Sequence, residues 1–162
     1  MAENKTHILA RPGEQQLVIT REFAVPPEPV FAAHVDPALF ARWFGCHGMT
    51  TMIDEFTPRR GGCYRFTQAL AGRPLHACRG VFHAVVHSSL IVRTVEFEEQ
   101  PGGVILETTR FATPAAGKTR ISVHSVFESV ADRDRMLAAG VEKGAAETYS
   151  RLSELLRVTE SN

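Results

Sequence analysis

The stretch that decides the fold is VADRDRMLAAGVEKGAAETYSRLSELLR, which runs from Val130 to Arg157. Its apolar residues recur every three or four positions, the spacing of one face of an α-helix. Ser129 comes directly before it and is a residue type that caps helices, with Asp132 three positions later. We therefore predict one long C-terminal helix over residues 130–157. At about 1.5 Å per residue it would extend roughly 40 Å, enough to cross a whole sheet.

Two glycines interrupt the interior of this predicted helix. Gly140 and Gly144 lie one turn apart on the side that should face the sheet, with Ala145 beside them. An interior glycine costs a helix about 1 kcal/mol relative to alanine, so the pair needs a reason. One reason is a close approach of the helix backbone to another element. The other is open volume between the helix and the sheet.

The segment after the polar N-terminus changes period twice. Residues 17–25 alternate between apolar and polar side chains, which predicts a strand. The prolines at positions 26 and 27 end this strand and can open a helix. Asp36 and the proline after it restart the helical pattern, and Gly45 closes it. We predict two short, tightly joined helices after the first strand.

From Thr50 to Phe127 the helical period disappears. Turn residues at 61–62, 72–74, 87–89, 101–103 and 115–117 divide this stretch into about six strands. With the first strand they form an antiparallel sheet of about seven strands. The predicted class is α+β, with the long C-terminal helix laid across a curved sheet. We expect a single domain over residues 16–158, preceded by a flexible leader at residues 1–15.

Composition excludes several classes of partner. The chain has 18 basic and 18 acidic residues, whereas non-specific binding of nucleic acid needs a basic surface. The longest run without Asp, Glu, Lys or Arg has 13 residues, while a membrane-spanning helix needs roughly 20 apolar ones. Residues 1–16 contain no apolar core of the signal-peptide kind. We expect no nucleic-acid partner, no membrane insertion and a cytoplasmic location.

The residues that commonly carry metal or nucleophilic chemistry are scattered. Soft ligands occur at Cys46-His47, Cys63 and His76-x-Cys78, but no two cysteines have zinc-ligand spacing. The sequence contains no nucleophile elbow, kinase signature or dinucleotide fingerprint. We therefore predict no metal site, no cofactor and no catalytic residue, which favours a protein that is not an enzyme.

Two charged residues fall on faces that strand parity assigns to the core. Glu107 alternates in phase with Ile105 and Phe111, and Arg21 alternates in phase with Ile19. A buried charge is costly unless it has a partner or faces a water-filled cavity. Alternatively, either strand contains a bulge, or the charge lies near the rim of the sheet. If the parity holds, both residues are candidates for the polar part of a binding site.

Several short motifs follow one another in a fixed order along the chain. They are Leu17-Val18-Ile19-Thr20-Arg21-Glu22-Phe23, Val30-Phe31, Asp36-Pro37, Arg42-Trp43-Phe44-Gly45, Arg59 with Gly61-Gly62, Arg79-Gly80-Val81-Phe82, Gly117-Lys118-Thr119-Arg120, Asp132-Arg133-Asp134, residues 140–149 and Arg151-Leu152. From about Gln16 to Arg157 this order resembles the START-like, or SRPBCC, superfamily, and within it the branch of the activator of heat-shock protein 90 ATPase homologues.

The resemblance implies a helix-grip fold, a seven-stranded antiparallel sheet around the C-terminal helix with a pocket between them. Members of the wider superfamily bind lipids, hormones and polyketides, or cyclise aromatic precursors. The branch has no shared catalytic motif to carry over. Cys46 stands where the branch commonly has proline, and Glu107 stands where it commonly has an apolar or small residue.

These features lead to a first hypothesis, a binding protein for a small hydrophobic or amphipathic ligand. Pockets for such ligands are mainly apolar with few polar groups. The predicted lining residues are Arg21, Trp43, Phe66, Phe82, Glu107, Phe111, Met136, Gly140, Gly144 and Tyr149.

Two alternatives remain open at this point. One is an enzyme of cyclase or hydrolase type in which Glu107 acts as general base. The other is an interaction protein that uses the outer face of the sheet, either to activate a chaperone ATPase or to form a homodimer.

Overall fold

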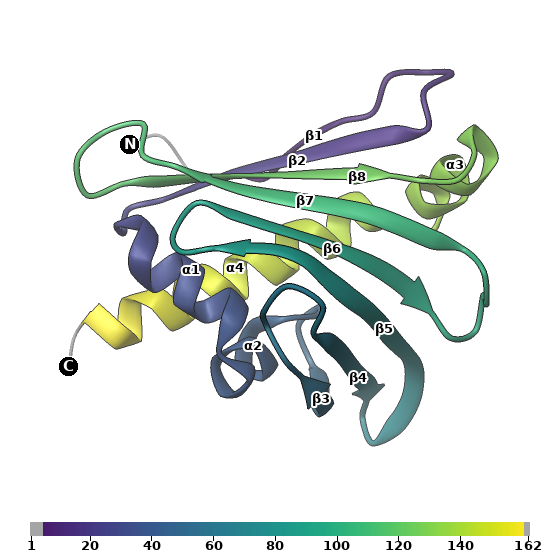
Figure 1. Ribbon diagram of the computed structural model, residues 1–162, viewed down its shortest axis with the longest axis horizontal. Helices are drawn as coiled ribbons and strands as arrows, with labels where there is room; N and C mark the ends of the chain where they lie inside the picture. The colour runs from purple at the N-terminus through teal and green to yellow at the C-terminus, as the bar shows by residue number, and fades with distance from the viewer. Residues whose placement is uncertain (1–4, 161–162) are drawn as a thin grey trace.

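The computed structural model describes residues 5–160, and the side chains of residues 5–157. This part of the chain forms one antiparallel sheet and four helices (Figure 1). The strands are β1 (His7–Leu9), β2 (Gln16–Phe23), β3 (Met49–Phe56), β4 (Cys63–Leu70), β5 (Arg73–Val86), β6 (Leu90–Phe97), β7 (Val104–Ala112) and β8 (Thr119–Val126). The helices are α1 (Pro27–Val35), α2 (Pro37–Trp43), α3 (Val130–Ala138) and α4 (Val141–Glu160). The α+β class and the helix-grip arrangement are confirmed.

The sheet has the order β1-β2-β8-β7-β6-β5-β4-β3, which gives eight strands in the described residues rather than seven. The additional strand is β1, which lies inside the segment predicted as a flexible leader. It pairs with β2, and Ile8 of β1 lies opposite Ile19 and packs against the core. Three residues are too few to show a period of two, so alternation could not reveal it. Residues 1–4 of the predicted leader lie outside the described residues.

The two short helices follow β2 as predicted. Asp36 separates them, and its side chain accepts hydrogen bonds from the backbone N–H groups of Ala38 at 2.9 Å and Leu39 at 3.2 Å. It therefore caps α2 in the manner its sequence position indicates. Phe40 and Trp43 of α2 are each 1% exposed, which fixes this helix against the inner face of the sheet.

The prediction of one continuous helix over residues 130–157 is wrong. Helix α3 ends at Ala138, and α4 begins at Val141. Between them Gly140 has a φ of +91°, a backbone conformation that side-chain-bearing residues adopt only at a cost. The apolar spacing continues across the break because both helices turn an apolar side toward the core, so periodicity alone did not reveal it.

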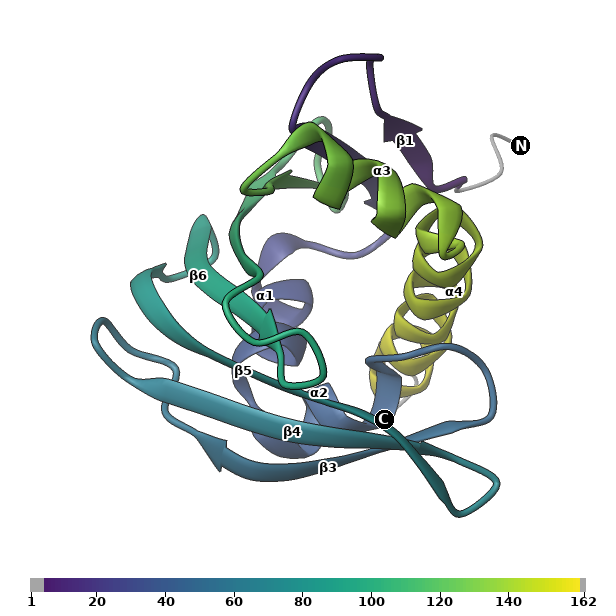
Figure 2. The ribbon, with the colours of Figure 1, turned by 90° about the vertical axis from the view of Figure 1, so that its right-hand side faces the viewer.

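The sheet is strongly curved, and its concave side holds most of the helices. In Figure 2 the strands curve from β3 and β4 past β6 to β1, and α4 stands across the open side. Helix α4 packs against α1, α2 and β2. The core lies on this concave side and is rich in aromatic rings, which include Phe23, Phe40, Trp43, Phe66 and Phe82. The described residues contain no helix with the length and apolar character to cross a membrane.

Candidate ligand-binding cavity

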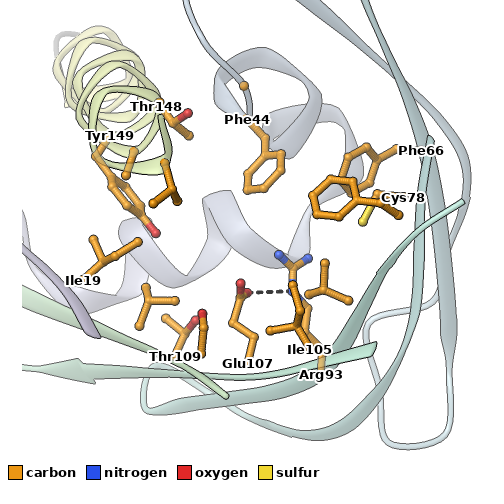
Figure 3. Close-up of a pocket in the computed structure, with 18 of the residues that line it drawn as sticks. Ile19, Phe44, Phe66, Cys78, Arg93, Ile105, Glu107, Thr109, Thr148 and Tyr149 are labelled. Atoms are coloured by element: carbon orange, nitrogen blue, oxygen red, sulfur yellow. Dashed lines mark hydrogen bonds and ion pairs between the residues drawn. The ribbon is translucent and has the colours of Figure 1, made fainter. Parts of the chain in front are cut away.

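A cavity of about 270 Å³ lies between the concave face of the sheet and helices α2 and α4. Its walls are mostly apolar. The aromatic lining residues are Phe40, Trp43, Phe44, Phe66, Phe82, Phe97, Phe127 and Tyr149, and the aliphatic ones include Leu17, Ile19, Ile91, Val95, Ile105 and Val123. The polar side chains that reach the cavity come from His34, Gln68, His76, Arg93, Glu107, Thr109, Ser125 and Thr148. Figure 3 shows how side chains from the sheet and from α4 face one another across it.

An ion pair lies on the sheet wall of this cavity. Arg93 of β6 and Glu107 of β7 are direct partners in the antiparallel register. The Nε of Arg93 donates to Oε1 of Glu107 at 2.9 Å, and the two side chains are 10% and 21% exposed (Figure 3). Strand parity correctly placed Glu107 on the inner face, and its charge is compensated by the neighbouring strand.

Aromatic rings hold the Arg93 guanidinium. Its central carbon lies 4.9 Å from the ring centre of Tyr64, 5.8 Å from that of Phe44 and 5.9 Å from that of Phe40. A cation over a ring face within about 6 Å is attracted by the ring quadrupole. The guanidinium is therefore held by the hydrogen bond to Glu107 and by its contacts with these three aromatic rings.

Tyr64 reaches this position because residue 80 is a glycine. The Tyr64 hydroxyl donates to the backbone carbonyl of Thr94 at 2.6 Å and passes over Gly80. A Cβ at position 80 would lie 1.9 Å from the Thr94 carbonyl oxygen and 2.7 Å from the Tyr64 hydroxyl. Gly80 is thus required by close packing, and it positions the ring that stacks on Arg93.

A second polar group lies at the end of the cavity nearest α2. Gln68 is 4% exposed, and its amide nitrogen donates to the carbonyl of Phe44 and to Thr51, each at 3.2 Å. Its amide oxygen accepts from Nε2 of His76. Because these groups bond to one another, they connect β4 and β5 to the end of α2. They add polarity to the wall without a charge.

His34 of α1 also lines the cavity. Its Nδ1 donates to the backbone carbonyl of Val30 at 2.7 Å, and its ring packs against Trp43 and Phe111. The pKa of His34 is lowered to about 4, mainly by burial and also by the positive charge of Arg93, while the bond to Val30 acts in the opposite direction. His34 is therefore a neutral side chain at neutral pH.

Burial also keeps the nearby hydroxyl and thiol groups neutral. It raises the pKa of Tyr149 above its ordinary value, and Glu107 acts in the same direction. It raises the pKa of Cys78 to about 12, although Arg93 acts to lower it. For Arg93 itself, burial is the largest single influence and lowers the pKa, but Glu107, Tyr64 and Cys78 together outweigh it and the net pKa is raised. The charged groups on the wall are thus Arg93 and Glu107.

Seven of the predicted site residues line this cavity, and three do not. Those that line it are Trp43, Phe66, Phe82, Glu107, Met136, Gly144 and Tyr149. Phe111 points to the concave side but is covered by the rings of Phe31 and His34. Gly140 is exposed at the break between α3 and α4, and a Cβ built there meets no atom within 4 Å. Its role in the lining was predicted from a helix that does not continue.

Arg21 is buried on the inner face of β2, as parity predicted, but outside the cavity. Its terminal nitrogens donate to Thr6 at 3.1 Å and to Ser153 of α4 at 3.3 Å. Burial lowers the pKa of Arg21, and the charge of Arg157 acts in the same direction. Arg21 thus joins β2, the N-terminal segment and α4. Its contacts are those of a structural residue.

Arg93 is the main site residue that sequence reasoning missed. The signal was present, because Arg93 alternates in phase with Ile91 and Val95, and all three are less than 9% exposed. Gln68 and His76 carry no such charge signal, and the register of β4 and β5 shifts beside them. The described residues contain no group of three or more His, Cys, Asp or Glu side chains placed to hold a metal ion.

The sequence matches a known protein family. The family profile described as Activator of Hsp90 ATPase homolog 1-like protein matches residues 24–157. The chain belongs to this family. A search of curated proteins found no match.

Solved structures show the same family architecture. A protein from Rhodobacter sphaeroides is 24% identical, with a TM-score of 0.84 over 94% of this chain and 99% of the other. A protein from Mycobacterium smegmatis is 21% identical, with a TM-score of 0.83 over 94% of this chain and 96% of the other. The AHSA1 protein from Silicibacter pomeroyi is 20% identical, with a TM-score of 0.74 over 89% and 99%. At such identities the likeness establishes the fold alone.

Proposed function

We propose that the protein binds a small, mostly apolar molecule in the cavity between the sheet and α4. The observation that supports this most directly is the make-up of the wall, where aromatic and aliphatic side chains surround the Arg93–Glu107 pair. Sites for small molecules have this pattern of apolar walls with a few placed polar groups. The superfamily to which the chain's motifs are similar also includes binders of lipids, hormones and polyketides.

The size of the cavity supports the same proposal. Protein interiors are close-packed, and voids larger than a water molecule are few. A volume of about 270 Å³ is many times the roughly 10–15 Å³ that a single water needs in the same measure. The absence of side-chain bulk at Gly144 contributes to this volume, because a Cβ there would meet the Cys46 sulfur at an ordinary 3.5 Å. A space of this kind is costly for stability alone and is useful for binding.

The proposal is tested with a neutral aromatic probe, 2-naphthalenemethanol, measured by titration calorimetry. We expect the wild-type protein to bind it and the variant Gly144→Leu to lose at least tenfold in affinity, since leucine extends into the cavity. Thr148→Leu fills the cavity one turn later and provides a second variant, because Thr148 also lines it.

The matched control is Lys143→Leu, which adds the same side chain to α4 at a position 85% exposed. It should fold and bind like the wild type. If the probe does not bind the wild-type protein, or binds both cavity-filled variants as well as the wild type, the proposed function is wrong.

The two alternatives stay predictions. In the enzyme hypothesis Glu107 is the general base, but its Oε1 accepts a hydrogen bond from Arg93 at 2.9 Å, an arrangement that favours a structural or binding role. Activation of a chaperone ATPase would use the outer surface and is suggested by the family's name. A direct assay of chaperone ATPase stimulation separates that role from binding in the cavity.

A further inference from the structure

We propose that the ligand is a compact aromatic carboxylate and that its carboxylate binds the two terminal nitrogens of Arg93. This inference rests on the proposed binding function and adds the chemical class of the ligand. It concerns the polar end of the cavity, whereas the proposal above concerns its apolar volume.

The first observation is the hydrogen bonding of Arg93. An arginine has five N–H donors, and the structure assigns one of them, on Nε, to Glu107. Neither Nη1 nor Nη2 has a hydrogen-bond partner among the described residues, although Arg93 is only 8% exposed. Neither atom is among the fully buried side-chain atoms that lack a partner, so both keep surface that a ligand can reach. The remaining donors face the cavity (Figure 3).

The second observation is the way the guanidinium is oriented. Glu107 holds the Nε side, and the rings of Tyr64, Phe44 and Phe40 lie within 6 Å of the guanidinium carbon. The edge formed by the two terminal nitrogens is thereby turned into the cavity on the side of Phe44 (Figure 3). A fixed edge with two parallel donors matches the two oxygens of a carboxylate, and it loses little freedom on binding.

The third observation is a polarity along the cavity. Near the Cys78 thiol the effect of Arg93, which lowers the pKa, exceeds that of Glu107, which raises it. Near the Tyr149 hydroxyl the order is reversed, and Glu107 has the stronger effect on the pKa. The influence of Arg93 thus exceeds that of Glu107 beside Cys78, which lies on the same side of the cavity as Arg93 (Figure 3). An anion bound there meets attraction first and the repulsion of Glu107 at a longer distance.

The body of the ligand follows from the walls beside this edge. The ring of Phe44 lies 5.8 Å from the guanidinium carbon and packs against Phe66 and Trp43, and Tyr149 lies across the cavity on α4 (Figure 3). Flat rings pack well among such side chains. The volume of about 270 Å³ is near the lower end of small-molecule sites, which favours a ligand of one or two rings over a long chain.

The test compares three probes that share a naphthalene body: 2-naphthoate, 2-naphthalenemethanol and 2-naphthylmethylammonium. At pH 7.5 we expect the wild-type protein to bind the carboxylate at least tenfold more tightly than the alcohol, and the ammonium most weakly. If the alcohol binds as tightly as the carboxylate or more tightly, the inference is wrong while the proposed function stands. If none of the three binds, the proposed function fails and the inference fails with it.

The double variant Arg93→Met/Glu107→Leu removes the ion pair without leaving an unpaired charge, so it should still fold. It should bind the carboxylate no more tightly than the alcohol while keeping its affinity for the alcohol. The matched control is Arg79→Met/Glu96→Leu, which removes a pair joined at 2.8 Å between β5 and β6 on the outer face of the sheet. The control should keep the preference for the carboxylate. A preference that survives in the Arg93 double variant would overturn the assignment.

Discussion

Two buried arginines, Arg133 of α3 and Arg93 of β6, differ in how their donors are used. Arg133 is 2% exposed and donates to the backbone carbonyls of Arg11 and Gln16 at 2.9 and 3.1 Å, with Asp134 as ion-pair partner at 2.8 Å. Arg93 is 8% exposed and has one such bond, to Glu107. The difference separates an arginine that fastens α3 to the N-terminal segment from one whose donors face a cavity.

Of the substitutions considered for this comparison of Arg133 with Arg93, we expect the one at Arg133 to reduce stability most. Arg133→Met leaves the carbonyls of Arg11 and Gln16 without a charged donor, and each such loss costs about 1–3 kcal/mol. We expect the free energy of unfolding, measured by urea denaturation, to fall by about 2–4 kcal/mol. Affinity for 2-naphthoate should be unchanged under conditions where the variant is folded.

The control for this prediction is Arg135→Met on the same helix. Arg135 is 69% exposed and pairs with Asp132, and exposed pairs contribute little. A loss as large as that of Arg133→Met would mean that any charge removed from α3 is destabilising. The stability loss of Arg133→Met could then not be attributed to the hydrogen bonds that Arg133 donates.

A side chain at position 80 is expected to displace Tyr64, whose ring contacts the Arg93 guanidinium. Gly80→Ala places a Cβ 1.9 Å from the Thr94 carbonyl oxygen, so the strand or Tyr64 must move. Overpacking of this kind costs about 1–3 kcal/mol, and we expect about 2 kcal/mol by urea denaturation. Affinity for 2-naphthoate should also fall severalfold, since Tyr64 no longer holds the guanidinium.

Gly144→Ala is the matched change on the other wall of the cavity. Its Cβ would lie at 3.5 Å from the Cys46 sulfur, and alanine favours a helix over glycine by up to about 1 kcal/mol. This variant should be as stable as the wild type or more so. Equal losses at both positions would show that close packing at Gly80 has no special part in the support of Arg93.

The protonation of His34 makes the stability of the protein depend on pH. Its folded pKa of about 4 lies below the unfolded value of about 6.5, so the unfolded state binds the proton first on acidification. This contribution to stability is complete above pH 6.5 and is lost as the pH falls toward 4. By pH 5 the loss amounts to about 2 kcal/mol. Comparing wild type with His34→Phe from pH 7 to pH 5 isolates it.

The charge of Arg93 should be visible in the same measurement. Because Arg93 acts to lower the pKa of His34, the double variant Arg93→Met/Glu107→Leu should lose less stability on acidification than the wild type. Arg133→Met should keep the full loss. Identical pH profiles for all three proteins would show that neither arginine reaches His34 electrostatically.

Much of the fold was predictable because its signals are local. Six strands between residues 49 and 126 and the cap at Asp36 follow from alternation, turn residues and side-chain chemistry within a few positions. The inward orientation of Glu107 follows from the same parity. These properties depend on neighbours in the sequence, so the sequence displays them directly.

The parts that were missed depend on neighbours in space. Glu107 requires a partner, but which strand supplies Arg93 is set by the register of β6 against β7. Phe111 faces inward but is covered by α1, whose position over the sheet no local pattern indicates. The break at Gly140 was hidden because two helices with apolar sides toward one core reproduce a single helical period.

Gly140 gives the smallest expected effect and the sharpest test of this correction. Gly140→Ala forces a side-chain-bearing residue into a left-handed conformation at a φ of +91°, at a cost of about 1 kcal/mol. A continuous helix would instead gain stability from the same change, since alanine is the better helix former. Whether the free energy of unfolding falls or rises therefore distinguishes a break between α3 and α4 from one continuous helix with Gly140 in its interior. Affinity for 2-naphthalenemethanol should stay within twofold of the wild type, because Gly140 is exposed and lies outside the cavity that Gly144 lines.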